Sequence, residues 1–299
     1  KFIFYYVKIL LMEEIKILKK EDWPENILEM ADAPEQLYYI GEKPNWDSTF
    51  LTVVGSRKYS QYGKEVCEKL IAGLKGYDIT IISGLALGID AIAHHSALEN
   101  GLKTMAVPGS GLNRDVIYPK SNFPLAEKIL KSGGTLLSEY EPNQEAAPWT
   151  FPQRNRIMAG LAKATLVIEA TERSGTLITA RLALEYNREV CAVPTSIFSF
   201  YGKGSNKLLN QGATPITCSQ DLLQVLGFDE EDNKAQLEMK FNDCSSDEKL
   251  ILQNILEPKT RDELIRLLEM PASQINILLS SMEIKGLVSE SLGKIYVKN

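Results

Sequence analysis

From residue 50 the chain alternates between short apolar segments and longer stretches with helical spacing. The apolar segments are rich in β-branched residues, as buried strands are. They predict strands at Leu51–Val54, Ile79–Ile82, Thr104–Val107, Thr135–Leu137, Thr165–Ile168 and Val190–Val193. Such alternation predicts an α/β fold with a doubly wound, mostly parallel sheet. Ligands of these sheets bind beyond the carboxyl ends of the strands, so the segments that follow each strand are the candidates for function.

Residues 1–48 are predicted to be a lead-in segment that packs against this main domain, residues 49–227. The run Phe2–Met12 is apolar but too short to cross a bilayer as a helix. It lacks the small-residue cleavage site of a secretory signal. We therefore interpret it as translated sequence upstream of a start at Met12, with a signal peptide as the alternative.

The C-terminal region is predicted to be a small separate domain behind an acidic linker, residues 228–246. Residues 247–299 show three helical patterns and a hairpin-like end, at Asp247–Leu256, Arg261–Leu268, Pro271–Lys285 and Leu287–Val297, with Gly293 at the turn. Three helices and a hairpin match a winged-helix domain, a class that includes DNA readers and protein-docking modules. The third helix has one cation, Lys285, so we favour docking or dimer contact.

Composition narrows the classes of function. The net charge of −6 is unusual for a nucleic-acid binder, but the linker segment 228–248 alone carries −6, whereas residues 50–220 carry +4. An acidic linker can therefore coexist with a basic groove.

The four cysteines are scattered without a CxxC pair, which fits a reducing cytoplasm and argues against a zinc site. The only histidines, His94 and His95, are adjacent and cannot share a helix face. We expect a cytoplasmic protein without metal or cofactor.

The turn after the first predicted strand is the first candidate site. Gly55 and Ser56 let the chain turn, and a helical pattern begins shortly after Arg57. A strand, a glycine turn and a helix in this order direct backbone N–H groups at one place, which suits an anion. The guanidinium of Arg57 adds a fork that matches a phosphate. The alternative is a tight turn with a solvated arginine.

Similar polar turns follow the other predicted strands. The candidates are Ser83 and Gly84 after the second strand, Lys120 and Asn122 after the third, Ser174 and Gly175 after the fifth, and Lys207 after the sixth. Each turn taken alone is equally well a packing turn or a solvated loop. All of them would open on the same sheet edge, which favours one shared site for a polyanion, with Tyr118 and Phe151 as stacking surfaces.

A further basic cluster, Arg154, Asn155 and Arg156, follows the fourth strand. Pro152 can begin a helix, which places the three residues in its first turn. Cations there oppose the helix dipole. An anionic ligand explains that placement better than stability does. The alternative is that Arg156 pairs with Glu139 or Glu169.

Taken together, these motifs resemble the DNA-processing protein A (DprA/Smf) family over roughly Trp23–Leu226. The matching runs are VVGSR at 53–57, SGLALGIDAIAHHSAL at 83–98, YPKSN at 118–122, LLSEY at 136–140, FPQRNRIMAGL at 151–161, VIEATERSGTLITARLALE at 167–185, AVP at 192–194 and GSNKLLNQGA at 204–213. So many ordered motifs are far more specific than any one of them.

The resemblance implies an extended Rossmann-like domain that binds single-stranded DNA. It also implies a homodimer without catalytic activity that helps load RecA recombinase during natural transformation or recombination. The family's phosphate-contacting turn, polar loop and basic pocket correspond here to Gly55, Ser56 and Arg57, to Lys120 and Asn122, and to Arg154 and Arg156. The family's usual N-terminal helical module has no match here, so we carry over no role for it.

An enzyme is the alternative from a different class. The segment Arg154–Ala180 also resembles lysine-decarboxylase-like phosphoribohydrolases, which cut nucleoside monophosphates and carry a PGGxGTxxE signature. Here Ser174 and Gly175 replace the paired glycines, and Thr179 stands where the catalytic glutamate belongs. A hydroxyl cannot supply the proton chemistry of a carboxylate, so we expect no hydrolysis. A small-nucleotide sensor would use the same pocket without chemistry.

Overall fold

The computed structural model describes residues 14–228, 245–255, 259–268, 270–285, 287–291 and 293–297. Its internal contacts divide the chain into two units, Lys1–Gly227 and Phe228–Asn299. The interpretation of Phe2–Met12 and that of nearly all of the acidic linker concern residues outside this description.

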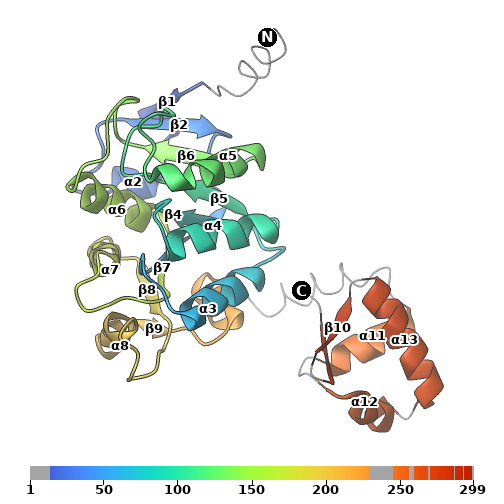
Figure 1. Cartoon of the computed structure of the whole chain (residues 1–299). Helices are drawn as coiled ribbons and strands as arrows, with labels where there is room; N and C mark the ends of the chain where they lie inside the picture. The colour runs from blue at the N-terminus through green and yellow to red at the C-terminus, as the bar shows by residue number, and fades with distance from the viewer. Residues whose placement is uncertain are drawn as a thin grey trace. The chain divides into compact units, whose positions relative to one another are not determined.

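The larger unit is built on a nine-stranded sheet with the order β1-β2-β6-β5-β4-β3-β7-β8-β9 (Figure 1). Its strands are β1 Lys16–Leu18, β2 Leu37–Gly41, β3 Thr49–Val54, β4 Ile79–Ser83, β5 Lys103–Ala106, β6 Thr135–Ser138, β7 Ala164–Val167, β8 Glu189–Ala192 and β9 Thr214–Pro215. The strands from β6 to β9 in this order pair in parallel, whereas β2 pairs antiparallel with β6 and with β1. The predicted doubly wound, mostly parallel sheet is confirmed.

Helices cover both faces of this sheet. They are α2 Glu25–Leu28, α3 Gln61–Ala72, α4 Ile89–Glu99, α5 Phe123–Lys131, α6 Thr150–Leu161, α7 Thr176–Glu185, α8 Lys203–Asn210 and α9 Ser219–Val225, with short 3-10 turns η1 Lys20–Asp22 and η2 Lys120–Asn122. Figure 1 shows α6, α7 and α8 on one side of the sheet and α3, α4 and α5 on the other. Because both faces are covered, the central strands are buried and mostly apolar: every residue of Phe50–Val54 is buried, with Thr52 as its one polar member.

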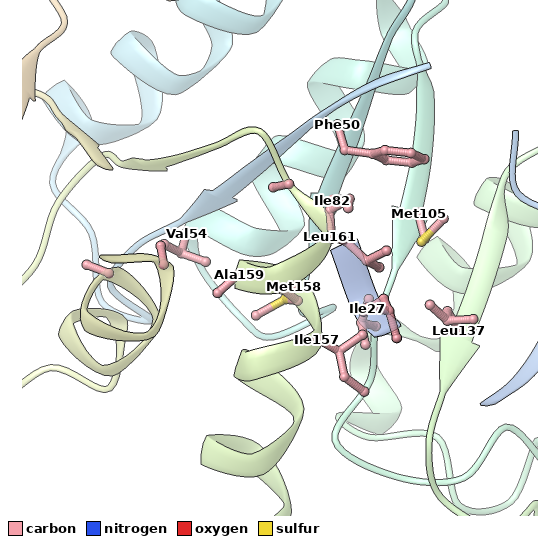
Figure 2. Close-up of a cluster of buried hydrophobic side chains, with 14 of the residues drawn as sticks. Ile27, Phe50, Val54, Ile82, Met105, Leu137, Ile157, Met158, Ala159 and Leu161 are labelled. Carbon is pink, nitrogen blue, oxygen red and sulfur yellow. The ribbon is translucent and has the colours of Figure 1, made fainter. Parts of the chain in front are cut away.

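The main core lies between the sheet and the layer that contains α6. Figure 2 shows side chains from α2, from the strands and from α6 in contact there, among them Ile27, Phe50, Ile82, Met105, Leu137, Ile157 and Leu161. The lead-in segment contributes to the same core, because Trp23 is buried and donates its indole N–H to the carbonyl of Leu18. Burial of this apolar surface fixes α6 against the strand ends, which positions the polar residues at its start.

The order in which strands are added to the sheet reverses between β3 and β7. From β3 the chain adds β4, β5 and β6 on one side, and then returns to add β7, β8 and β9 on the other. The loops that leave neighbouring strands β3 and β7 therefore diverge. Such a switch point leaves a crevice at the carboxyl ends of the strands, where open α/β sheets bind their ligands.

The smaller unit contains α11 Ser246–Asn254, α12 Arg261–Leu268, α13 Ala272–Ile284 and the antiparallel strands β10 Val288–Ser291 and β11 Lys294–Val297. Its own apolar core includes Ile251, Leu264, Ile275, Leu279, Val288 and Ile295. Gly293 turns the hairpin with φ +72°, a conformation that favours glycine. Three helices and a hairpin are thus present, and the winged-helix class itself stays a prediction.

Candidate nucleic-acid interface

A pocket of about 450 Å³ lies at the switch point between β3 and β7. Its walls come from the turn after β3, the first residues of α6 and the segment that leads into α7. This volume is in the range of small-ligand sites. Seven of the predicted site residues line it: Gly55, Ser56, Arg57, Arg154, Asn155, Ser174 and Gly175.

The turn after β3 is held rigidly by its neighbours. The backbone N–H of Ser56 donates to the carbonyl of Glu169 (2.8 Å), and the carbonyl of Ser56 accepts from the N–H of Ile89 (3.3 Å). The buried carboxylate of Glu169 accepts from the N–H and hydroxyl of Ser60 at 2.9 and 2.6 Å. A Cβ on Gly55 would lie 2.6 Å from the side chain of Ile89. Close packing against Ile89 therefore explains why position 55 is a glycine, and the backbone that carries Arg57 is fixed.

Arg57 forms a row with two aromatic rings at the rim of the pocket. Its guanidinium lies 5.3 Å from the centroid of the Phe151 ring, and that ring lies 5.7 Å from the ring of Tyr118. Tyr118 is 46% exposed. No ion pair of Arg57 with a carboxylate is found within the described part of the chain. The Arg57–Phe151–Tyr118 row thus combines a cation with π faces, the combination that binds single strands.

Arg154 is a buried part of the pocket lining, and its guanidinium is already hydrogen-bonded within the protein. It is only 4% exposed, and its Nη1 donates to the carbonyl of Gly84 (2.6 Å) and to that of Val107. Gly84 and Val107 directly follow β4 and β5, so Arg154 ties the ends of these strands to α6. Burial lowers the pKa of Arg154 to about 10, and the nearby carboxylate of Asp90 opposes that shift. A Cβ on Gly84 would collide with the guanidinium, so packing explains this glycine too.

An anionic ligand was inferred from the sequence to explain the arginines near the start of α6, and the structure gives another explanation for Arg154. The helix begins at Thr150, two residues before Pro152, and Arg154 donates to the carbonyls of the residues that directly follow β4 and β5. Backbone carbonyls carry partial negative charge and can replace the ligand that the sequence pattern suggested.

Asp90 is a buried carboxylate of the pocket that sequence reasoning missed. It lies in the first turn of α4, lines the pocket and accepts a hydrogen bond from the N–H of Gly84 (3.1 Å). Burial raises its pKa, while the charges of Arg154 and Arg57 act in the opposite direction. An acidic residue just after a glycine-rich turn is typical of a helix start, and this signal could have identified it.

Arg156 faces a different recess. Its guanidinium forms an ion pair with Glu139 and donates to the carbonyl of Asp32, whose carboxylate lies 3.8 Å from Nε. Burial raises the pKa of Glu139, and the charge of Arg156 opposes this shift. Pairing with Glu139, the alternative considered above, is what the structure shows. Arg156 is thus separated from the pocket that Arg57 lines.

Besides Arg156 and Gly84, four other predicted residues lie outside the pocket. Ser83 is fully buried and donates to the carbonyl of Val53 (2.7 Å). Asn122 donates to the carbonyls of Leu85 (2.9 Å) and Ala86 (3.1 Å) and so holds the loop after β4. The lysines of the set, Lys120 on η2 and Lys207 on α8, are exposed. The side chains of the serine and the asparagine thus take part in hydrogen bonds within the fold, whereas those of the two lysines are exposed to solvent.

The start of α7 leaves open space at Gly175. No atom lies within 4 Å of the place where a Cβ on Gly175 would be, so packing does not require glycine here. The hydroxyl of Ser174 accepts from the N–H of Thr176 (3.2 Å) and caps this turn locally. Open space beside a helix start lets a phosphate approach the backbone closely. Thr179, which stands at the position of the hydrolases' glutamate, is buried in the pocket wall.

Lys58, Phe200 and Tyr201 also line the pocket and were not among the predicted site residues. The last two come from the loop between β8 and α8. Within the described residues, no helix is long and apolar enough to cross a membrane, and no group of three His, Cys, Asp or Glu side chains could hold a metal ion.

Comparison with known proteins places this architecture. The family model of DNA recombination-mediator protein A matches residues 14–227. The chain is 43% identical over 206 residues to DNA processing protein DprA of Streptococcus pneumoniae, across 69% of this chain and 72% of that protein. It is 41% identical over 208 residues to protein Smf of Escherichia coli, across 70% of this chain and 55% of that protein. The match thus spans just over half the length of the E. coli relative.

Solved structures agree with this assignment. The X-ray structure of S. pneumoniae DprA gives a TM-score of 0.66 at 39% identity, with 75% of this chain and 77% of that chain covered. The structure of DNA processing protein A from Helicobacter pylori, described for its single-stranded DNA binding mode, gives 0.65 at 28% identity, with 72% and 96% covered. The chain therefore belongs to the DNA recombination-mediator protein A family, the family of the DprA and Smf proteins.

Proposed function

We propose that this protein binds single-stranded DNA along the carboxyl edge of its sheet, without strong sequence preference. The observation that carries the proposal is the Arg57–Phe151–Tyr118 row at the rim of the pocket. A guanidinium can hold a phosphate while the rings stack on bases, and every base offers a π face. The single-stranded DNA binding of the H. pylori relative supports the same function here.

Within this site the predicted residues divide into two groups. We propose that Arg57, the N–H groups beside Ser56 and Gly175, and the exposed Lys120 and Lys207 contact phosphates. Ser83, Gly84, Asn122 and Arg154 instead hold the surrounding loops and strand ends through hydrogen bonds, and Arg156 pairs with Glu139 outside the pocket. Asn155 lines the pocket and accepts from Nε of Arg154 (3.2 Å), so its amide N–H groups can still face a ligand.

We further propose that the bound strand is a substrate for assembly of RecA recombinase, in natural transformation or recombination, and that the protein acts as a homodimer. Membership of a recombination-mediator family supports this role. The domain boundaries follow the same proposal: DNA binding in residues 49–227 and protein docking in residues 247–299. The third helix of the small unit, α13, exposes Ile277 and Ile284 and has no cation before Lys285.

We expect the protein to bind single-stranded oligonucleotides more tightly than duplexes of equal length, because stacked bases in a duplex cannot reach the aromatic row. Affinity should fall steeply as salt rises, since release of counterions from the phosphates drives binding. Fluorescence anisotropy across a salt titration tests both points. Equal affinity for the two forms, or a flat response to salt, would contradict the proposal.

We expect no hydrolysis of nucleoside monophosphates. Thr179 replaces the glutamate of the hydrolases, and Asp90, the only carboxylate among the described residues that line the pocket, is held by the N–H of Gly84. Incubation of the protein with AMP, followed by chromatography, should release no more adenine than a blank. Release at an enzymatic rate that disappears in Asp90→Asn would show instead that the pocket is catalytic.

A further inference from the structure

The loop between β8 and α8 presents an unusual set of apolar side chains to solvent. Ile197 is 80% exposed, Phe198 91% and Phe200 67%. Three large apolar residues within four positions form a patch that a soluble surface rarely tolerates without a binding role. No function described above uses this patch.

The base of this loop is firmly tied. The side chain of Asn206 accepts from the N–H of Thr195 (3.1 Å) and donates to its carbonyl (3.0 Å). The hydroxyl of Tyr62 donates to the carbonyl of Pro194 (2.8 Å), and the N–H of Gly204 donates to that of Ala170 (2.7 Å). The tip is therefore carried on a fixed support, and Phe198 and Phe200 are exposed there.

The loop is continuous with the proposed DNA site. Phe200 and Tyr201 line the same pocket as Arg57 and Phe151, so aromatic side chains reach it from the loop as well as from α6. Phe200 contacts Tyr201 edge to face, with ring centroids 5.7 Å apart. Two exposed lysines, at positions 203 and 207, follow on α8. Aromatic rings with cations close by in the sequence match the chemistry of a strand of bases and phosphates.

We infer that Phe198 and Phe200 form a second base-stacking subsite for the DNA strand where it leaves the pocket. The inference rests on the proposed function and extends it, because it assigns the strand's path beyond the Arg57–Phe151–Tyr118 row. Phe200 stacks on the base at the pocket wall, and Phe198 on the next base outside. The phosphates between them face the lysines of α8.

Three variants separate this role from a general hydrophobic one. The double variant Phe198→Ala/Phe200→Ala removes two stacking rings and should bind oligo(dT) more weakly by at least the factor of about 5 to 150 that corresponds to about 1–3 kcal/mol for one stacked base. Phe198→Tyr/Phe200→Tyr should retain most of the affinity, since tyrosine also stacks. The matched control Ile197→Ala removes an equally exposed side chain of the same loop that cannot stack, and should change affinity less than twofold.

The salt dependence and a spectroscopic signal give independent readouts. The double variant should keep the salt slope of the original protein, because stacking releases no counterions. In Phe200→Trp, oligo(dT) should quench tryptophan fluorescence beyond the change seen in the parent protein. An abasic oligonucleotide of the same length should not cause this additional quenching.

The outcomes distinguish this inference from the proposed function. If the parent protein does not bind single strands, the proposed function fails. If it binds with a steep salt slope but the double variant binds equally well, only the stacking subsite is overturned. A loss in Ile197→Ala as large as that in the double variant also overturns it, because it indicates that the loop affects DNA binding through its apolar bulk or its conformation and not through stacking.

Discussion

Arg154→Ala should lower the free energy of unfolding by about 2–4 kcal/mol, the range for loss of a buried, hydrogen-bonded charge. The change removes the donor to the carbonyls of Gly84 and Val107, and it unties α6 from the ends of β4 and β5. It also removes the larger of the two cationic charges that act on the buried carboxyl of Asp90, and leaves only the weaker effect of Arg57. Urea unfolding followed by circular dichroism measures the loss.

The loss in Arg154→Ala should grow as pH rises. Burial already raises the pKa of Asp90 in the folded protein, and removal of Arg154 raises this pKa further. An acid whose folded pKa lies above its unfolded value binds more protons in the folded state, so stability falls with pH between the two values. The pH range between the unfolded and the folded pKa of Asp90 is wider in the variant. Unfolding curves at pH 5.5 and pH 8 should therefore differ more for the variant than for the parent protein.

A different result would reassign Arg154. If Arg154→Ala kept the parent's stability at both pH values while DNA affinity collapsed, its guanidinium would be a phosphate ligand rather than a positioning group. The double variant Arg154→Ala/Asp90→Asn offers a control. It removes the buried negative charge of Asp90, so the double variant should regain part of the stability that Arg154→Ala loses at pH 8.

The central sheet could be predicted because its strands are buried on both faces and read as apolar runs. All six predicted strands exist within two residues of their expected ends. The strands β1, β2 and β9 were missed for different reasons. In β2 the run Leu37–Gly41 lies in a region rich in proline and charge, and its pairing with β6 joins segments nearly a hundred residues apart. β9 has two residues, too few for any periodic signal.

The site could be predicted only in part, because hydrogen-bond partners come from distant segments. Motif spacing located the turn at Arg57 and the segment before α7, and both line the pocket. It could not show that Arg154 meets a carbonyl seventy residues away. Nor could it place Arg156 beside Glu139 rather than a phosphate, although it left that pairing open. Charge at a helix start indicates a neighbouring acceptor but does not identify it.

Arg57→Ala should weaken binding of single-stranded DNA by about 1–3 kcal/mol, as loss of a charge-assisted hydrogen bond to phosphate would. It should also reduce the salt slope by about one, since one phosphate contact is lost. Arg57→Lys should recover only part of the affinity, because an ammonium keeps the charge but lacks the planar fork that pairs with phosphate and stacks on Phe151. Anisotropy titrations at several salt concentrations give both quantities.

Stability should change little in Arg57→Ala, because the side chain is exposed and, among the described residues, lies over an aromatic ring without forming an ion pair. Arg114→Ala is the matched control: Arg114 also lies over an aromatic ring, Phe123, at 4.7 Å, but outside the pocket. It should leave affinity nearly unchanged. Melting temperature and affinity are to be measured on the same samples. A large fall in the melting temperature of Arg57→Ala with unchanged affinity would remove Arg57 from the site, and with it the phosphate role of the turn at Gly55 and Ser56.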